Sequence, residues 1–302
     1  MILLTIWPLF ALICTGHVMA RFAFPAPGFW PAAERLNYFV LFPALLLSSL
    51  VDAPVRDPAI LRLGGAAVVV ILLACAAMAL VRRVRPAPAA RFGPAVQGMV
   101  RFNTYLGLAI LVALVGQPGV ERAAVYLALA VPLVNVLSIL ALTEGGEARA
   151  PARLARTILR NPLILACLAG LALALTGVGL PFGIGRFMEL IAQGSLPLGL
   201  LCVGAALQLD AARRDMTALA AVSALRLLAM PVLAAAVGWA FGLGQVEALV
   251  LVVFSAIPTA PTAYVLTRQL GGDGTFMAGL VTAQTLAAVA TIPLVLMVYW
   301  AR

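Results

Sequence analysis

The sequence has no lysine, a single histidine and few acidic residues. Only 10% of its 302 residues are charged, whereas 64% are hydrophobic and the mean hydropathy is +1.10. A soluble domain of this length could not bury so much apolar surface in one core. The composition therefore indicates an integral membrane protein whose solvent is the lipid bilayer.

The chain is also short of the groups that enzymes and metal sites need. It has no HExxH or GxSxG motif and no acidic residue expected in mid-membrane, which disfavours an intramembrane enzyme. Its four cysteines lie inside apolar runs, without CxxC spacing or a neighbouring histidine, and are interpreted as small core residues: Cys14, Cys75, Cys167 and Cys202. We expect no metal and no other cofactor.

The net charge of +9 comes from 20 arginines, which cluster in short gaps between apolar runs. They form no continuous basic face with aromatic platforms, so nucleic-acid binding is not expected. Thirteen of them lie beside the gaps that follow the odd-numbered apolar segments, and five lie on the opposite side. The positive-inside rule then predicts that both termini are on the non-cytoplasmic side.

The apolar segments are long enough to be membrane helices, which need about 20 residues to cross the hydrocarbon core. Ten segments qualify: 2–21, 34–52, 61–81, 93–115, 120–142, 159–179, 187–209, 217–241, 247–269 and 275–299. The first has no positively charged start and is interpreted as a helix, not a cleaved signal peptide. The sequence thus predicts an all-α integral membrane protein with ten transmembrane helices.

Proline and glycine positions suggest an internal duplication. Pro8 and Pro162, Pro43 and Pro197, and Gly16 and Gly170 are each separated by 154 residues. This offset pairs the first and second segments with the sixth and seventh. Because each half has an odd number of helices, the second would be inverted. We expect repeats at 1–142 and 159–302, joined by a polar cytoplasmic linker at 143–158.

Two segments in corresponding positions, the fourth and the ninth, are expected to be interrupted. Prolines in the ninth remove backbone donors in mid-membrane, and polar residues gather halfway through the fourth. The alternatives are a simple proline kink and interhelical hydrogen bonding. The candidate substrate-binding residues at these breaks are Arg101, Asn103, Thr104, Tyr105, Pro258, Thr259, Pro261 and Thr262.

Arg101 and Arg226 lie about 12 to 14 Å inside their segments at the helical rise. No Asp or Glu is expected at that depth, so their partners would be either carbonyl ends of broken helices or a bound anion. The same shortage of acids disfavours a cation as substrate. Backbone carbonyls with Asn103, Thr259 or Thr262 could still hold sodium, and coupling to protons or sodium stays open.

Three residues are candidates for coupling or gating. Arg226 is one, His17 could carry a proton, and Asp52 at the outer end of the second segment could gate transport. A lone histidine is more often a packed, hydrogen-bonded residue, and Asp52 is more simply explained as capping a helix end.

Several motifs, in order, resemble the auxin efflux carrier family, within the bile acid/sodium symporter-like inverted-repeat superfamily. They are the runs 37–49, 101–107, 160–162, 197–204, 226–231, 254–262 and 291–293. The resemblance implies crossing broken helices 4 and 9, an elevator-type motion, carboxylate substrates and, for a bacterial member, the inner membrane. The first break lacks the proline that plant members often have, and the linker lacks their long loop.

The sequence therefore favours a carrier that moves a small organic anion, with a carboxylate as the expected class, by an elevator-type alternating-access mechanism. A non-transporting sensor or scaffold with the same fold and a selective channel are the alternatives. The expected partners are the anion and the lipid bilayer, and small residues would permit a homodimer. Substrate identity, direction and coupling ion are left open.

Overall fold

The computed structural model describes residues 2–26, 28–51, 57–143, 161–181 and 183–300, and all regular secondary structure in those ranges is helical. Eight helical segments there are long and apolar enough to cross a membrane. Shorter apolar helices, Pro162–Thr176 and Gln245–Ala256, lie in the sixth and ninth expected segments. The structure thus confirms an all-α membrane protein. Residues 144–158 of the expected linker, and Asp52, lie outside the described residues.

Each expected segment corresponds to one or more helices. In chain order they are α1 (Ile2–Arg21), α2 (Phe29–Leu36), the π-helical η1 (Asn37–Leu41), α3 (Phe42–Val51), α4 (Pro58–Val84), α5 (Ala89–Val100), α6 (Thr104–Val115), α7 (Gln117–Leu142), α9 (Pro162–Thr176), α10 (Ile184–Gln193), α11 (Ser195–Ala205), α12 (Leu209–Ala212), α13 (Met216–Ala224), the π-helical η3 (Leu225–Ala229), α14 (Met230–Ala240), α15 (Gln245–Ala256), α16 (Thr262–Gln269) and α17 (Gly274–Trp300). The second segment starts earlier than expected, at Phe29.

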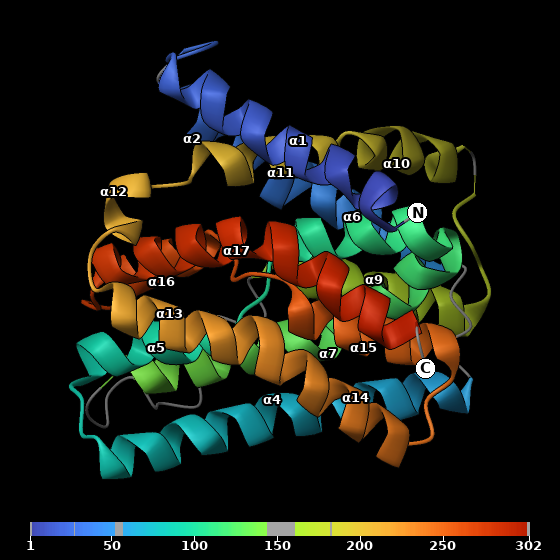
Figure 1. Ribbon diagram of the computed structural model, residues 1–302. Coiled ribbons are helices and arrows are strands. Elements are labelled where there is room, and N and C mark those ends of the chain that lie inside the picture. Colours follow the sequence, from blue (N-terminus) through green and yellow to red (C-terminus); the bar gives the residue numbers. More distant parts are fainter. Residues whose placement is uncertain (1, 27, 52–56, 144–160, 182, 301–302) are drawn as a thin grey trace.

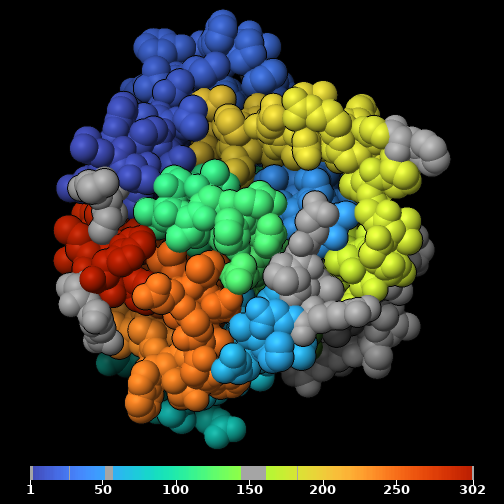
Figure 2. Space-filling view, turned by 90° about the vertical axis from the view of Figure 1, so that its right-hand side faces the viewer, coloured from blue at the N-terminus to red at the C-terminus, as the bar shows by residue number. Residues whose placement is uncertain are grey.

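The helices form layers around a central group (Figure 1). α1, α2, α10 and α11 lie at the top of this view, α4 and α14 lie at the bottom, and α5, α7, α15 and α17 lie between them. α1 packs mainly on α11 and α3 on α9, whereas α14 packs on α15 and α5 on α7. The start of α1 and the end of α17 are on the same side of the molecule (Figures 1 and 2).

Glycines allow α1 and α11 to approach each other closely. A Cβ at Gly16 would overlap with the backbone of Leu201, and one at Gly204 would overlap with the carbonyl oxygen of Ile13. A Cβ at Gly170 of α9 would lie 2.7 Å from Cβ of Leu50 in α3. Backbone atoms cannot move aside as a flexible side chain can, so these helix pairs require glycine at the contacts.

We expect the Gly204→Ala substitution to destabilise the protein by about 1 to 3 kcal/mol, the usual cost of overpacking. Gly185→Ala is the matched control, because the nearest atom to a Cβ there is Cβ of Leu180 at 3.6 Å. Alanine favours a helix over glycine, so the control should be neutral or slightly stabilising. Thermal unfolding in detergent measures both; equal midpoints would contradict a tight α1–α11 contact.

Candidate functional site

The ninth segment is interrupted by two prolines. α15 ends at Ala256, and α16 begins at Thr262. Pro258 has no N–H to donate, and the residue before it, Ile257, is extended at φ −80° and ψ 153°, as the ring of a following proline favours. Pro261 occupies the N-cap position of α16. The expected break in this segment is confirmed.

The fourth segment is interrupted without a proline. α5 ends at Val100 and α6 begins at Thr104, with Arg101 extended at φ −77° and ψ 147°. Asn103 is the N-cap of α6, and its Oδ1 accepts a hydrogen bond from the Leu106 N–H at 3.2 Å. An asparagine cap satisfies one donor of the new helix and so stabilises its start. The break expected here is also confirmed.

The two interruptions touch each other. The backbone N–H of Asn103 donates to the carbonyl of Pro258 at 2.8 Å. Gln284 of α17 joins them a second time: its Oε1 accepts from the Thr259 N–H at 2.9 Å, and its Nε2 donates to the Gly98 carbonyl at 2.9 Å. Backbone groups freed by both breaks are thereby paired inside the protein, as a membrane interior demands.

Arg226 pairs the carbonyl ends of the half-helices. Its Nε donates to Ile257 O at 2.9 Å, Nη1 to Met99 O at 3.0 Å and Nη2 to Phe254 O at 2.7 Å. The side chain is only 1% exposed. The C-terminal ends of α5 and α15 carry partial negative charge, which the guanidinium neutralises. The expected partner of this arginine was either the carbonyl ends of broken helices or a bound anion. The structure pairs it with the carbonyls.

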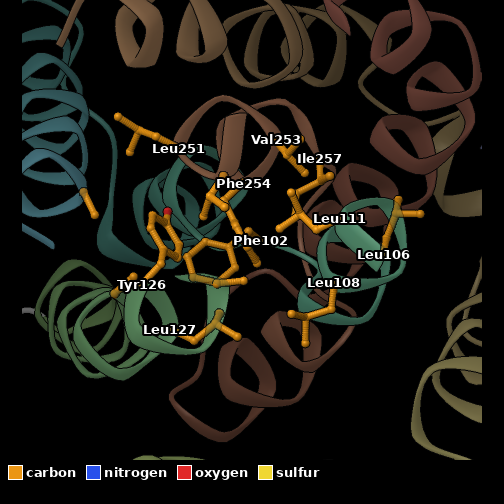
Figure 3. Packing of buried hydrophobic residues seen from close by; sticks show 14 of the residues in the cluster. Phe102, Leu106, Leu108, Leu111, Tyr126, Leu127, Leu251, Val253, Phe254 and Ile257 are labelled. Atoms are coloured by element: carbon orange, nitrogen blue, oxygen red, sulfur yellow. The ribbon is translucent and has the colours of Figure 1, made fainter. Parts of the chain in front are cut away.

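An aromatic cluster packs against the interruptions. The rings of Tyr126 and Phe254 stack with centroids 4.6 Å apart, and Phe102 meets Phe254 edge-on at 5.3 Å. Figure 3 shows these three rings together among buried aliphatic side chains. Because Phe102 belongs to the first break and Phe254 to the end of α15, their packing holds the two half-helices side by side.

The N-terminal ends of α6 and α16 face a common cavity. A small cavity of about 50 Å³ is lined from both ends by Asn103, Thr104, Tyr105, Pro261 and Thr262. A larger one of about 750 Å³ shares six lining residues with it: Glu34, Tyr38, Thr104, Leu163, Ala260 and Thr262. The first backbone N–H groups of a helix have no intrahelical acceptor, and the helix dipole adds positive charge there.

Two buried donors of residues that line these cavities are unpaired. Arg101 lines the larger cavity, and its Nη2 lies 3.4 Å from Oγ1 of Thr262. Its Nη1 is buried without a hydrogen-bond partner among the described residues, and so is Nδ2 of Asn103. Unpaired buried donors are costly. Those of Arg101 and Asn103 differ from the other such donors among the described residues, for example Oγ of Ser223, because they belong to residues that line these cavities.

The structure separates the candidate residues into groups. Arg101, Asn103, Thr104, Tyr105, Pro261 and Thr262 line the cavities. Pro258, Thr259 and Arg226 lie behind them: all three are buried, and their polar contacts are the bonds that hold the breaks. His17 lines a separate cavity with Arg21, Gln208, Asp210 and Arg213, so it is not part of this site.

Sequence reasoning missed two residues here. Glu34 was not considered among the acids, yet it lines both cavities together with Tyr38, one helical turn later. Glu34 thus shares the larger cavity with Arg101, although no ion pair joins these two described residues. Gln284 gave no signal beyond being a polar residue in an apolar helix, which is itself a reason to suspect a role.

Two interrupted helices that meet at a shared cavity inside an all-helical membrane protein are an arrangement found in many transporters. Residues 148–296 match the family model described as "Membrane transport protein". The chain is 29% identical over 304 residues to a protein of Rhizobium meliloti (strain 1021) named "Putative malonate transporter", covering 94% of this chain and 92% of that protein. Both matches agree with the resemblance to the auxin efflux carrier family, and they indicate a transporter, not an enzyme.

Proposed function

We propose that the protein is a carrier for a small organic anion with at least one carboxylate. The observation that carries this is the meeting of two helix N-termini and two unpaired buried donors at adjoining cavities. Asn103, whose Nδ2 is unpaired, lines the small cavity, and Arg101, whose Nη1 is unpaired, lines the larger one. Helix N-termini attract anions, and a guanidinium matches the planar geometry of a carboxylate. Thr104 and Tyr105 add hydroxyl groups at the same place.

The charge arrangement favours an anion over a cation. The negative C-terminal ends of α5 and α15 face Arg226, away from the cavity lining, while the positive ends of α6 and α16 line it. A cation would meet two positive helix ends and an arginine there. Proton or sodium coupling is compatible with such a site, because the coupling ion need not share the anion's contacts.

Alternating access is the mechanism we propose, with two inverted five-helix repeats and an elevator-type movement. The helix pairs support a repeat, since α1 on α11 corresponds to α9 on α3 under the 154-residue offset. The larger cavity reaches Arg35, Asn161 and Gln269, beside the arginine-rich gaps. By the positive-inside rule this is the cytoplasmic side of a bacterial inner membrane, with both termini outside and the cavity open inward.

Malonate is the first substrate to test, because the relative's name includes it. We expect purified protein in liposomes to take up labelled malonate or a related carboxylate. Asn103→Ser should weaken binding about tenfold or more, since a hydrogen bond to a charged group contributes about 1.5 to 3 kcal/mol. Serine caps a helix as well as asparagine does, so the thermal midpoint should stay close to that of wild type.

The panel of anions should include mono- and dicarboxylates and an uncharged amide of the same size. Saturable uptake of a carboxylate, lost or weakened in Asn103→Ser and absent for the amide, is the result we expect. Binding without flux would favour the sensor or scaffold. If no carboxylate binds and none raises the thermal midpoint, the anion carrier proposal is wrong.

A further inference from the structure

Glu34 is an acidic side chain placed where the anion is proposed to bind. It lies on α2, is partly buried, and lines both the small and the large cavity. No described residue forms an ion pair or hydrogen bond with it. The other charged side chains that line the larger cavity are Arg35 and Arg101. An unpaired carboxylate at an anion site would weaken binding unless it has a role there.

We propose that Glu34 takes up a proton when a dicarboxylate binds, so that the dianion and one proton occupy the site together. The proposal rests on the carrier function proposed above. The proton is taken from the buffered bulk solution at the cavity mouth, adds to the Glu34 carboxylate to form a neutral carboxyl group, and returns to the solution when the substrate is released. No other bond forms or breaks.

The charge of the cavity supports this exchange. Protonation of Glu34 raises the net charge of the side chains that line the larger cavity from +1 to +2, which brings it nearer to the complement of a dicarboxylate. The exposed Arg35 contributes less to this charge than Arg101 does, because solvent screens it. Like charges that share a small desolvated site cannot all stay ionised at low cost. A neutral Glu34 can also donate a hydrogen bond to a substrate oxygen, which the ionised form cannot do.

None of the other titratable groups around Glu34 can take up the proton in its place. The titratable or charged groups around it come from three parts of the chain. Its own helix and the next turn contribute Arg35 and Tyr38, the fourth segment contributes Arg101 and Tyr105, and α11 contributes Cys202. Asn161 at the start of α9 and Thr262 of α16 do not titrate. Tyrosine and cysteine ordinarily titrate above about pH 8, and arginine stays charged. Because tyrosine and cysteine are already protonated at neutral pH, Glu34 is the group among these that can take up a proton when a dianion binds.

Calorimetric binding in buffers of different ionisation enthalpy measures the protons taken up with the substrate. At pH 7.5, where malonate is fully ionised, wild type should take up about one proton per malonate, and its affinity should fall about tenfold per pH unit as pH rises. Glu34→Gln, which mimics the protonated side chain, should bind malonate without proton uptake and independently of pH. A monocarboxylate should bind wild type without proton uptake.

Glu189→Gln is the control, because Glu189 is exposed and pairs with Arg186 on α10; it should keep the proton uptake of wild type. Malonate binding to wild type with no proton uptake, or unchanged uptake in Glu34→Gln, would overturn the role of Glu34 and leave the anion carrier intact. If neither protein binds any carboxylate, the carrier proposal fails, and the role of Glu34 fails with it.

Discussion

Replacing Arg226 by methionine should cost the protein at least about 3 kcal/mol of stability and prevent most of it from folding. The substitution keeps an unbranched apolar stem but removes the donors to three carbonyls, those of Met99, Phe254 and Ile257. Each buried acceptor without a partner costs about 1 to 3 kcal/mol, and the ends of two helices lose their counter-charge.

A competing effect has the opposite sign, because burying a guanidinium is itself costly and methionine is apolar. Replacing a complete buried ion pair by apolar residues is often neutral for this reason. Here the carbonyls of α5 and α15 remain in place, since they belong to the backbone of the interrupted helices. The loss of their partners should therefore outweigh the gain from removing the charge.

The measurement is the yield of monodisperse protein in detergent, together with its thermal midpoint. Arg62→Met is the matched control: Arg62 is exposed and makes one hydrogen bond of 3.2 Å, to the Gly242 carbonyl. Arg226→Lys keeps the charge but cannot reach three separated carbonyls, so it should lie between the two. An Arg226→Met protein as stable as Arg62→Met would show that the interruptions do not depend on this residue.

The helices could be predicted because apolar length is a local property of the sequence. The break at Pro258 and Pro261 is local too, since proline removes the donor and disfavours helix before it. The break at Asn103 was predicted from polar residues and an assumed repeat, and it is held by contacts from far away in the chain: the Pro258 carbonyl and the aromatic ring of Phe254. No local pattern contains that information.

Which way a side chain points was the harder question. Arg101 and Arg226 look alike in the sequence, each an arginine deep in an apolar segment. The structure directs Arg226 to carbonyls and leaves Arg101 Nη1 unpaired at a cavity. Glu34 was overlooked because an acid near the end of a segment resembles an interfacial residue. Its place at the cavity depends on how α2 packs against α11, which the sequence does not encode locally.

Arg101→Gln should abolish anion binding while leaving the protein at least as stable as wild type. Removing a buried charge that pairs with a substrate costs about 2 to 5 kcal/mol, or about 30-fold to several thousandfold in affinity. The stability should not fall, because the guanidinium makes a single long hydrogen bond, 3.4 Å to Thr262, and has one buried donor without a partner among the described residues.

Binding of labelled malonate and the thermal midpoint without ligand are measured on the same preparations. Arg35→Gln is the control, because Arg35 lines the same cavity but is exposed; solvent screens its charge, so affinity should change only a few-fold. A fall in stability without a change in affinity would make Arg101 a structural residue like Arg226. If Arg101→Gln loses binding and is no less stable than wild type, the unpaired donor of Arg101 serves ligand binding and not the stability of the free protein.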